Sequence, residues 1–320
     1  MNISAGNTGK KRRIRYDRII IAVLVLVIIC ASIIFIRIGK KSSQKDKPVT
    51  DTKTSGSLST KNGKIEFEKI FLNKDDIYKG TLLLIDDDHI YKKQDSFDTT
   101  LANLDDMKST YFKLKSLDLK MESLTAKCFS SMMSGFYSEK SKNDIMVLNA
   151  YISEDHQNIM YNQALENSKK ICKGGYSEHQ SGLAFDLGIY PDKEEGTLFT
   201  STGDYTWITE NCMKYGFISR YPGSRYSESC DKEQDNHFRY VGIPHAYYMT
   251  ENNLTLEEYL NELKKYSFGE KTLSFSCYSK SYEIYYIKAA KDVNDVYVPC
   301  VNPYTISGNN EDGFIITVEK

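Results

Sequence analysis

Two histidines and one aspartate stand out because their side chains are ligands that zinc uses in hydrolases. His179 and Asp186 belong to one stretch, Ser-Glu-His-Gln-Ser-Gly-Leu-Ala-Phe-Asp, and His237 begins a second, His-Phe-Arg-Tyr-Val-Gly. Catalytic zinc sites commonly use three nitrogen or oxygen side chains and leave the fourth position to water. The sequence therefore predicts a Zn2+ site made of these three residues, where water becomes the nucleophile.

The two motifs resemble those of the VanY-like D-alanyl-D-alanine carboxypeptidases, zinc peptidases that trim cell-wall peptides. The similarity runs over roughly residues 65 to 320 and includes segments at 215–222 and 306–314. It implies an α+β fold of the hedgehog/DD-peptidase type, with a mixed, mainly antiparallel sheet flanked by helices. The resemblance also implies zinc binding at the three positions above. The side chains that it assigns to the substrate are Tyr151, Ser153, Gln157, Ser177 and Arg239.

The general base departs from the family pattern. In the family a glutamate lies three residues before the second histidine, and here that position holds Gln234. An amide cannot accept and return a proton as a carboxylate does. Glu233 and Asp235 flank Gln234, and a one-residue shift of this polar stretch brings Glu233 into place. Glu233 is therefore the candidate base, with Asp235 and the loss of a competent base as alternatives.

The expected partner of the substrate's terminal carboxylate is also missing. The family pattern Tyr-Arg-Ser is replaced by Tyr-Ile-Ser, so Ile152 stands where an arginine is expected. A guanidinium binds a carboxylate through two parallel hydrogen bonds, which isoleucine cannot make. Another cation must substitute, and the candidates are Arg220, Arg225 and Arg239.

The N-terminal part of the chain is typical of a membrane anchor. Residues 1–18 form a basic tail, and residues 19–36 carry no charge. At about 1.5 Å per residue the uncharged run spans about 27 Å, enough for the hydrocarbon core of a bilayer. Flanking positive charge stays in the cytoplasm. We expect a single-pass plasma-membrane protein with a cytoplasmic N-terminus and an extracytoplasmic catalytic domain, rather than a cleaved signal peptide.

Composition divides the remaining chain into three parts. Residues 37–64 are mostly Lys, Ser, Thr, Gly and Asp, which favours a flexible stalk. Residues 65–268 are expected to form the zinc carboxypeptidase-like domain, and residues 269–320 a small antiparallel β extension. Within the domain the apolar patterns predict strands at 81–85, 145–151 and 184–189, and helices at 124–136, 154–170, 205–215 and 255–266.

Charge and cysteine content limit the other possibilities. The net charge is −1 and the isoelectric point about 6.5, which argues against a nucleic-acid partner. Seven cysteines include Cys30 in the predicted membrane helix, and the other six face a compartment where disulfides persist. Their pairing is left open, and the sequence does not specify an oligomeric state.

These observations lead to one main functional hypothesis and two alternatives. The main hypothesis is a membrane-anchored D-alanyl-D-alanine carboxypeptidase that removes the terminal D-alanine from peptidoglycan stem peptides. The departures at Gln234 and Ile152 motivate a catalytically impaired family member that serves as a zinc-containing cell-wall binding or regulatory module. The second alternative is an LD-carboxypeptidase or endopeptidase that uses the same metal.

Overall fold

The computed structural model describes residues 66–107, 110–167, 171–220 and 236–320. Every described residue belongs to one compact unit of the chain. The predicted basic tail, transmembrane helix and stalk lie outside the described residues. Across the described ranges, no helix has the length and apolar character needed to cross a membrane.

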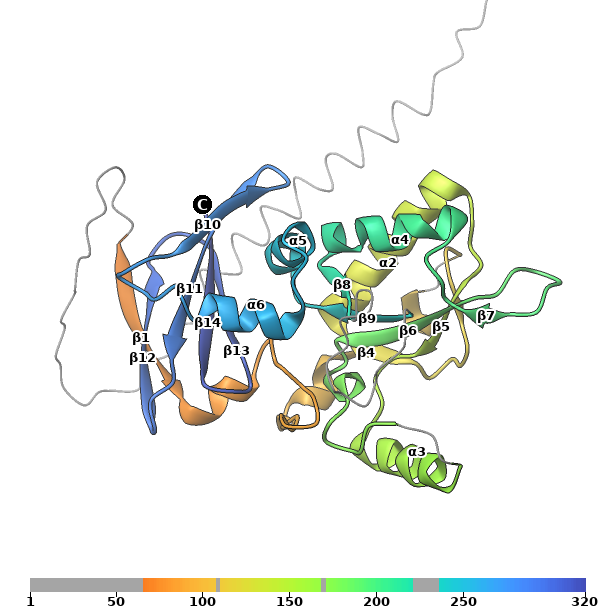
Figure 1. Cartoon of the computed structure of the whole chain (residues 1–320), viewed down its shortest axis with the longest axis horizontal. Helices are drawn as coiled ribbons and strands as arrows, with labels where there is room; N and C mark the ends of the chain where they lie inside the picture. Colours follow the sequence, from red (N-terminus) through yellow and green to blue (C-terminus); the bar gives the residue numbers. More distant parts are fainter. Residues whose placement is uncertain (1–65, 108–109, 168–170, 221–235) are drawn as a thin grey trace, which may run out of the picture. The chain divides into compact units, whose positions relative to one another are not determined.

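A six-stranded sheet forms the centre of the predicted catalytic domain (Figure 1). Its main path runs β3-β5-β6-β9-β8, and β7 pairs with β6 beside this path. The β3–β5 pair is parallel and the other pairs are antiparallel, as expected for a mixed, mainly antiparallel sheet. The strands are β3 (Lys113–Leu114), β5 (Ile145–Asn149), β6 (Ala184–Ile189), β7 (Thr197–Leu198), β8 (Phe217–Ser219) and β9 (His237–Tyr240).

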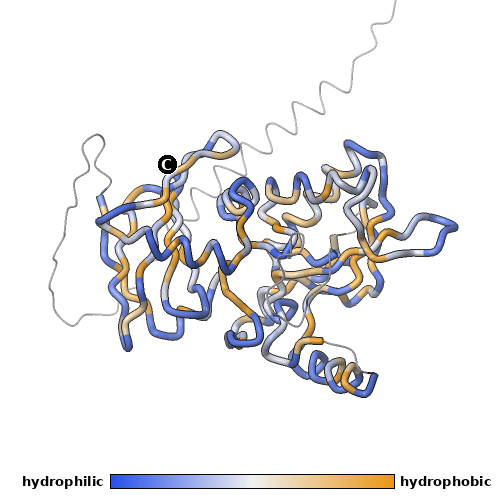
Figure 2. Tube along the Cα trace, in the orientation of Figure 1, coloured by the Kyte–Doolittle hydropathy of each residue, from blue (hydrophilic) through white to orange (hydrophobic). Residues whose placement is uncertain are grey.

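Side-chain alternation decides which residues of β6 and β9 face the hydrophobic core. Successive side chains of a strand point to opposite faces of the sheet. Phe185 and Leu187 of β6 join Phe238 of β9 in one buried hydrophobic cluster. Asp186 and His237, which alternate with these residues, therefore lie on the other face. Figure 2 shows the apolar character of the central strands and the hydrophilic character of many connecting loops.

Helix α2 (Ser123–Lys140) packs against the core face of this sheet. The Phe129 ring lies 4.9 Å from the Phe185 ring in an edge-to-face arrangement. Truncating a buried Phe to Ala typically costs about 3–5 kcal/mol, so this contact is a major part of the core. The helix begins where the Glu122 carboxylate accepts a hydrogen bond from the N–H of Leu124. The helix predicted at 124–136 is confirmed, although Leu124 itself is 50% exposed.

The helix predicted at 154–170 is present as α3 (Glu154–Glu166), and residues 168–170 lie outside the described part. Ser153 caps its start, because the hydroxyl accepts a hydrogen bond from the N–H of His156. The helix predicted at 205–215 combines α4 (Thr206–Asn211) with 3-10 turns on both sides. It ends at Gly216, whose φ of 85° suits glycine, as expected for a C-terminal cap.

Two further helices connect the central sheet to the C-terminal strands. Helix α5 (Ile243–Glu251) has a proline in its first turn, and α6 (Leu256–Leu263) starts with a capping box between Thr255 and Glu258. Figure 1 shows both helices beside the C-terminal strands. Their apolar side chains join residues of β11 and β14 in a second buried cluster.

The C-terminal β extension is a four-stranded antiparallel sheet in the order β10-β11-β14-β13. The predicted antiparallel character of residues 269–320 is therefore confirmed. A separate antiparallel pair joins β1, from the start of the described chain, to β12. The predicted boundary at residue 268 thus assigns β1 to the catalytic domain and β12 to the C-terminal extension, although the two strands pair in the structure. The strands are β1 (Phe67–Asn73), β10 (Leu273–Cys277), β11 (Lys280–Lys288), β12 (Val293–Pro299), β13 (Tyr304–Gly308) and β14 (Gly313–Glu319).

The strand predicted at 81–85 is wrong. Leu82 and Leu83 are buried as their apolar character suggests, but the segment belongs to no strand. Its backbone groups bond to side chains instead: the Leu82 N–H donates to the Ser307 hydroxyl at 2.9 Å. Arg239 donates to the carbonyls of Thr81 and Leu83. The apolar run is thus held largely by side chains, together with one backbone hydrogen bond from the Leu84 N–H to the Asn309 carbonyl at 3.1 Å, and it forms no strand.

The remaining short elements complete the described chain. β2 (Leu101–Asn103) pairs with β4 (Lys120–Glu122) in a small antiparallel sheet. The short 3-10 helices are η1 (Lys74–Tyr78), η2 (Phe97–Thr100), η3 (Asp105–Met107), η4 (Glu178–Ser181), η5 (Gly203–Tyr205) and η6 (Cys212–Tyr215). Among the described cysteines, Cys172 is disulfide-bonded, whereas Cys128, Cys212, Cys277 and Cys300 are free.

Candidate metal centre

His179 lies on the short 3-10 helix η4, which the chain leaves through Gly182 in a left-handed conformation with φ of 67°. A side chain at Gly182 would place its Cβ 3.0 Å from the backbone nitrogen of Glu122, so glycine fits this turn. The His179 ring is buried, and its Nδ1 donates a hydrogen bond to the Ala150 carbonyl at 2.8 Å. This contact leaves Nε2 directed toward Asp186, 3.2 Å from its Oδ2.

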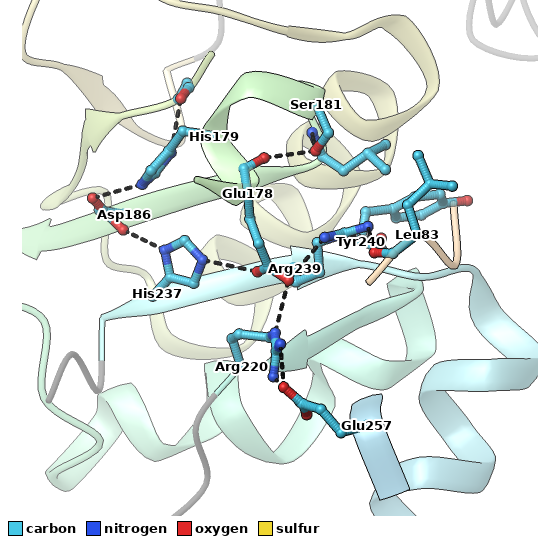
Figure 3. Close-up of polar contacts among 12 residues, drawn as sticks. Leu83, Glu178, His179, Ser181, Asp186, Arg220, His237, Arg239, Tyr240 and Glu257 are labelled. Atoms are coloured by element: carbon cyan, nitrogen blue, oxygen red, sulfur yellow. Dashed lines mark hydrogen bonds and ion pairs between the residues drawn. The ribbon is translucent and has the colours of Figure 1, made fainter. Parts of the chain in front are cut away.

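Asp186 and His237 lie opposite each other on adjacent antiparallel strands, β6 and β9. His237 Nδ1 is 2.8 Å from Asp186 Oδ1, and Asn149 donates a hydrogen bond to Asp186 Oδ2 at 2.8 Å. The rings of His179 and His237 are 4.9 Å apart and nearly perpendicular. One ligand atom from each of the three predicted residues lies within 4.8 Å of the others (Figure 3).

The donor set fits a zinc ion. Two imidazoles and one carboxylate are the ligand types of catalytic zinc sites. The ring nitrogens that face away from the cluster are held as well, by the Ala150 carbonyl for His179 and by the Glu178 carboxylate for His237. Such outer contacts fix the orientation of histidine ligands in metal sites. Within the described residues, this is the one group of His, Cys, Asp or Glu side chains close enough to share an ion.

Glu178 is a site residue that the sequence analysis missed. Its carboxylate is buried, with Oε2 lying 3.2 Å from His237 Nε2. Its Oε1 accepts hydrogen bonds from Arg220 Nε at 2.8 Å and from Arg239 at 2.9 Å. Burial alone would raise the pKa of Glu178, but the charges of both arginines and the hydrogen bond from His237 outweigh it and hold the pKa well below its usual range. Glu178 is therefore a buried anion beside the predicted ligands.

The electrostatics of the ligands follow from the same contacts. Burial would lower the pKa of His237, but hydrogen bonds to Asp186 and Glu178 outweigh it and raise the pKa to about 10. Burial would raise the pKa of Asp186, but His179 and His237 hold it well below its usual range. Metal binding at His237 Nδ1 requires loss of the proton there, because the ligand nitrogen needs its lone pair.

Arg239 and Arg220 lie in buried ion pairs with acidic side chains. Arg239 is fully buried, with contacts to Glu178 and to the backbone carbonyls of Thr81 and Leu83. Arg220 is also buried and bridges Glu178 to Glu257. The substrate-binding role of Arg239, and the choice of the cation that replaces the arginine missing at Ile152, stay predictions.

The other predicted substrate residues lie on the segments beside His179. The Tyr151 ring packs 5.5 Å from Phe97, and the adjacent Ile152 N–H donates to the His179 carbonyl at 3.3 Å. Gln157 donates to the Cys172 carbonyl at 2.7 Å, and its Oε1 is buried without a hydrogen-bond partner in the described structure. The Ser177 hydroxyl is also buried and has no hydrogen-bond partner in the described structure. Ser153 caps α3.

The candidate base lies in the connection between β8 and β9. The backbone N–H of Arg220, just after β8, donates to the His237 carbonyl at 3.0 Å. The last residue before the connection therefore lies next to the first residue of β9. Glu233, Gln234 and Asp235 lie within residues 221–235, outside the described residues, as does Arg225. The choice between Glu233 and Asp235 as base stays a prediction.

Comparison with known proteins agrees with this geometry. The sequence profile of the VanY family, described as D-alanyl-D-alanine carboxypeptidase, matches residues 118–243, which contain the three candidate ligands. A D-alanyl-D-alanine carboxypeptidase of Enterococcus faecium is 34% identical over 250 residues, covering 77% of this chain and 78% of the relative. The bifunctional D-Ala-D-Ala dipeptidase and D-Ala-D-Ala carboxypeptidase VanXYC of Enterococcus gallinarum is 31% identical over 127 residues, 37% of this chain and 67% of the relative.

A solved structure extends the similarity to the fold. The vancomycin resistance D,D-dipeptidase VanXYg, in complex with a D-Ala-D-Ala phosphinate analog, superposes with a TM-score of 0.70 at 28% identity. The match covers 79% of this chain and 99% of that chain. This chain therefore belongs to the VanY family of D-alanyl-D-alanine carboxypeptidases, a family of hydrolases.

Proposed function

We propose that this protein is a zinc-dependent carboxypeptidase that removes the terminal D-alanine from peptidoglycan stem peptides. The observation that carries the proposal is the cluster of His179, Asp186 and His237, with ligand atoms within 4.8 Å of one another. Family membership supplies the reaction class and the substrate class. The match to VanXYg, with its D-Ala-D-Ala phosphinate analog, supports the same substrate chemistry.

The proposed reaction divides the work between the metal and the chain. Zinc bound at such a site acts as a Lewis acid on the scissile carbonyl and makes water a nucleophile near neutral pH. His179, Asp186 and His237 would hold the ion through two imidazoles and one carboxylate. Glu233 is the proposed base: its carboxylate accepts the proton from water and returns it to the leaving amine, which Gln234 cannot do.

Two buried polar groups support peptide binding beside the metal. The Ser177 hydroxyl and Gln157 Oε1 lack hydrogen-bond partners in the described structure. A buried polar group without a partner costs about 1–3 kcal/mol, a cost that a bound peptide removes by supplying its own N–H and carbonyl groups. We propose that Ser177 and Gln157 contact the substrate backbone, with Tyr151 forming part of the wall beside them.

Recognition of the terminal carboxylate favours a second candidate function. Ile152 cannot bind a carboxylate, and Arg220 and Arg239 are held by Glu178. An endopeptidase with the same metal tolerates this loss, since an internal bond presents no free carboxylate. An LD-carboxypeptidase still meets the terminal carboxylate of a tetrapeptide and needs another group to bind it. A catalytically impaired module that binds zinc and cell-wall peptides is the remaining alternative.

We also propose that the protein is anchored in the plasma membrane by residues 19–36, with residues 37–64 as a stalk. The proposal is supported by the uncharged run and by the basic residues before it. The catalytic domain then faces the cell wall. Labelling of Cys300, which is exposed and free, by an impermeant maleimide on intact protoplasts tests this topology. Labelling only after lysis would contradict it.

The activity is tested with the full-length protein purified in detergent. D-Alanine release is measured from a stem pentapeptide, a stem tetrapeptide and a crosslinked peptide, after chelator treatment and after zinc addition. We expect zinc-restored release from the pentapeptide. A His179→Ala variant should release none, whereas His156→Ala, which changes an exposed histidine of α3, should behave as wild type. Release only from the tetrapeptide, or cleavage only of the crosslink, would favour the second candidate.

A further inference from the structure

Glu178 joins the predicted metal centre to two buried arginines. One carboxylate oxygen lies 3.2 Å from His237 Nε2, and the other accepts from Arg220 and Arg239 at 2.8 and 2.9 Å. Figure 3 shows these side chains as one continuous row of polar contacts from His179 to Glu257. The side chains of Glu178, Arg220, His237 and Arg239 are each 0–1% exposed.

The contact to Glu178 selects which nitrogen of His237 faces the metal. A neutral imidazole carries one N–H, and the nitrogen that binds a metal must keep its lone pair. An ionised carboxylate only accepts hydrogen bonds, so the proton is held on Nε2, opposite Glu178. Nδ1, which is 2.8 Å from Asp186 Oδ1, then carries the lone pair that a metal ligand needs.

The arginines keep Glu178 charged and fixed in this buried position. Burying a single carboxylate is costly unless it is paired and hydrogen-bonded. Arg239 is itself held by the carbonyls of Thr81 and Leu83, at 3.1 and 3.0 Å. Arg220 is held on its other side by both oxygens of Glu257, at 3.2 and 2.8 Å. Neither guanidinium can turn away without losing these contacts.

We propose that Glu178 is a positioning residue that orients His237 for metal binding, and that Arg220 and Arg239 hold Glu178 in place. The inference rests on the proposed metal site but not on catalysis, because it concerns affinity for the ion. Removing an outer-shell partner of a histidine ligand typically weakens metal affinity by about 10–100-fold. We expect a loss of this size in Glu178→Gln, which keeps the shape of the side chain and removes its charge.

The matched control is Glu257→Gln. It breaks an ion pair of the same row but leaves the contact between Glu178 and His237 untouched. Zinc affinity of the full-length protein is measured by competition with a chromogenic chelator, and thermal unfolding of the zinc-free proteins is measured alongside. We expect zinc affinity to fall about 10–100-fold in Glu178→Gln and to change less than about threefold in Glu257→Gln. Equal zinc affinities in the two variants would overturn the proposal.

A second measurement does not depend on the folding of a variant. The chain has five histidines, so selective 15N-histidine labelling of the zinc-loaded wild type gives few signals. We expect His237 to be protonated at Nε2 and His179 at Nδ1. A proton on His237 Nδ1 would overturn the positioning role while leaving the metal site intact. Failure of the wild type to bind zinc would instead contradict the proposed function, and the positioning role with it.

Discussion

Acid should weaken the fold through His245, a buried histidine outside the metal centre. His245 lies on α5, with Nδ1 2.8 Å from the Tyr259 hydroxyl and Nε2 3.1 Å from the Thr317 hydroxyl. These contacts join α5 to α6 and to β14 without supplying a negative charge. Burial therefore lowers the pKa of His245 to about 3, from an ordinary value of 6.5.

The sign and size of the effect follow from proton linkage. Between pH 6.5 and pH 3 the unfolded chain binds a proton at His245 and the folded chain does not. The free energy of unfolding therefore falls as the pH falls through this window. Each pH unit well inside the window costs about 1.4 kcal/mol, so lowering the pH from 8 to 5 removes about 2 kcal/mol through this residue alone.

The assay is chemical denaturation at pH 8 and pH 5, followed by the fluorescence of Trp207, the single tryptophan. All samples contain a chelator, so that zinc release does not contribute. His245→Gln, whose side chain does not titrate, should lose about 2 kcal/mol less between the two pH values than the wild type. Equal losses in the two proteins would refute the reasoning, because His245 would then titrate alike in the folded and unfolded chains.

Three further predictions concern the site. Arg239→Met should lower the free energy of unfolding by about 3 kcal/mol, measured by chemical denaturation. This loss is near the low end for breaking a buried ion pair, because Arg220 still neutralises Glu178. A loss under about 1 kcal/mol would contradict the buried network. Asp186→Ala should weaken zinc binding by more than about 100-fold, beyond the usual effect of an outer-shell change, in chelator competition. Wild-type affinity in that variant would remove Asp186 from the ligand set. Glu233→Gln should lower kcat for D-alanine release by about 100-fold or more, whereas Gln234→Asn should leave kcat unchanged. An unchanged kcat in Glu233→Gln would assign the base to another residue.

The sequence predicted the ligand cluster because its three residues lie in two motifs that resemble those of the VanY-like carboxypeptidases. His179 and Asp186 share one motif, and strand alternation on β6 and β9 brings Asp186 and His237 to the same face. The helix at 124–136 was equally predictable, since its apolar residues recur with helical spacing. In these parts the local pattern and the tertiary structure agree.

The remaining features depend on pairings that no local pattern contains. Glu178 meets Arg220 and Arg239 across 42 and 61 residues of chain, and the sequence offered only an acidic residue beside a histidine. The segment at 81–85 was predicted as a strand from its run of apolar residues. The side chain that donates to its carbonyls, Arg239, lies far away in the sequence. The pairing of β1 with β12 was missed for the same reason.

We propose that one zinc ion held by His179, Asp186 and His237 supports the removal of D-alanine. The most direct test titrates zinc into the chelator-treated full-length protein and follows D-alanine release from a stem pentapeptide ending in D-Ala-D-Ala. We expect no release without zinc and a rate that rises to a plateau at one zinc per chain. Protein that has bound one zinc and still releases no D-alanine, or release that persists without zinc, would contradict it.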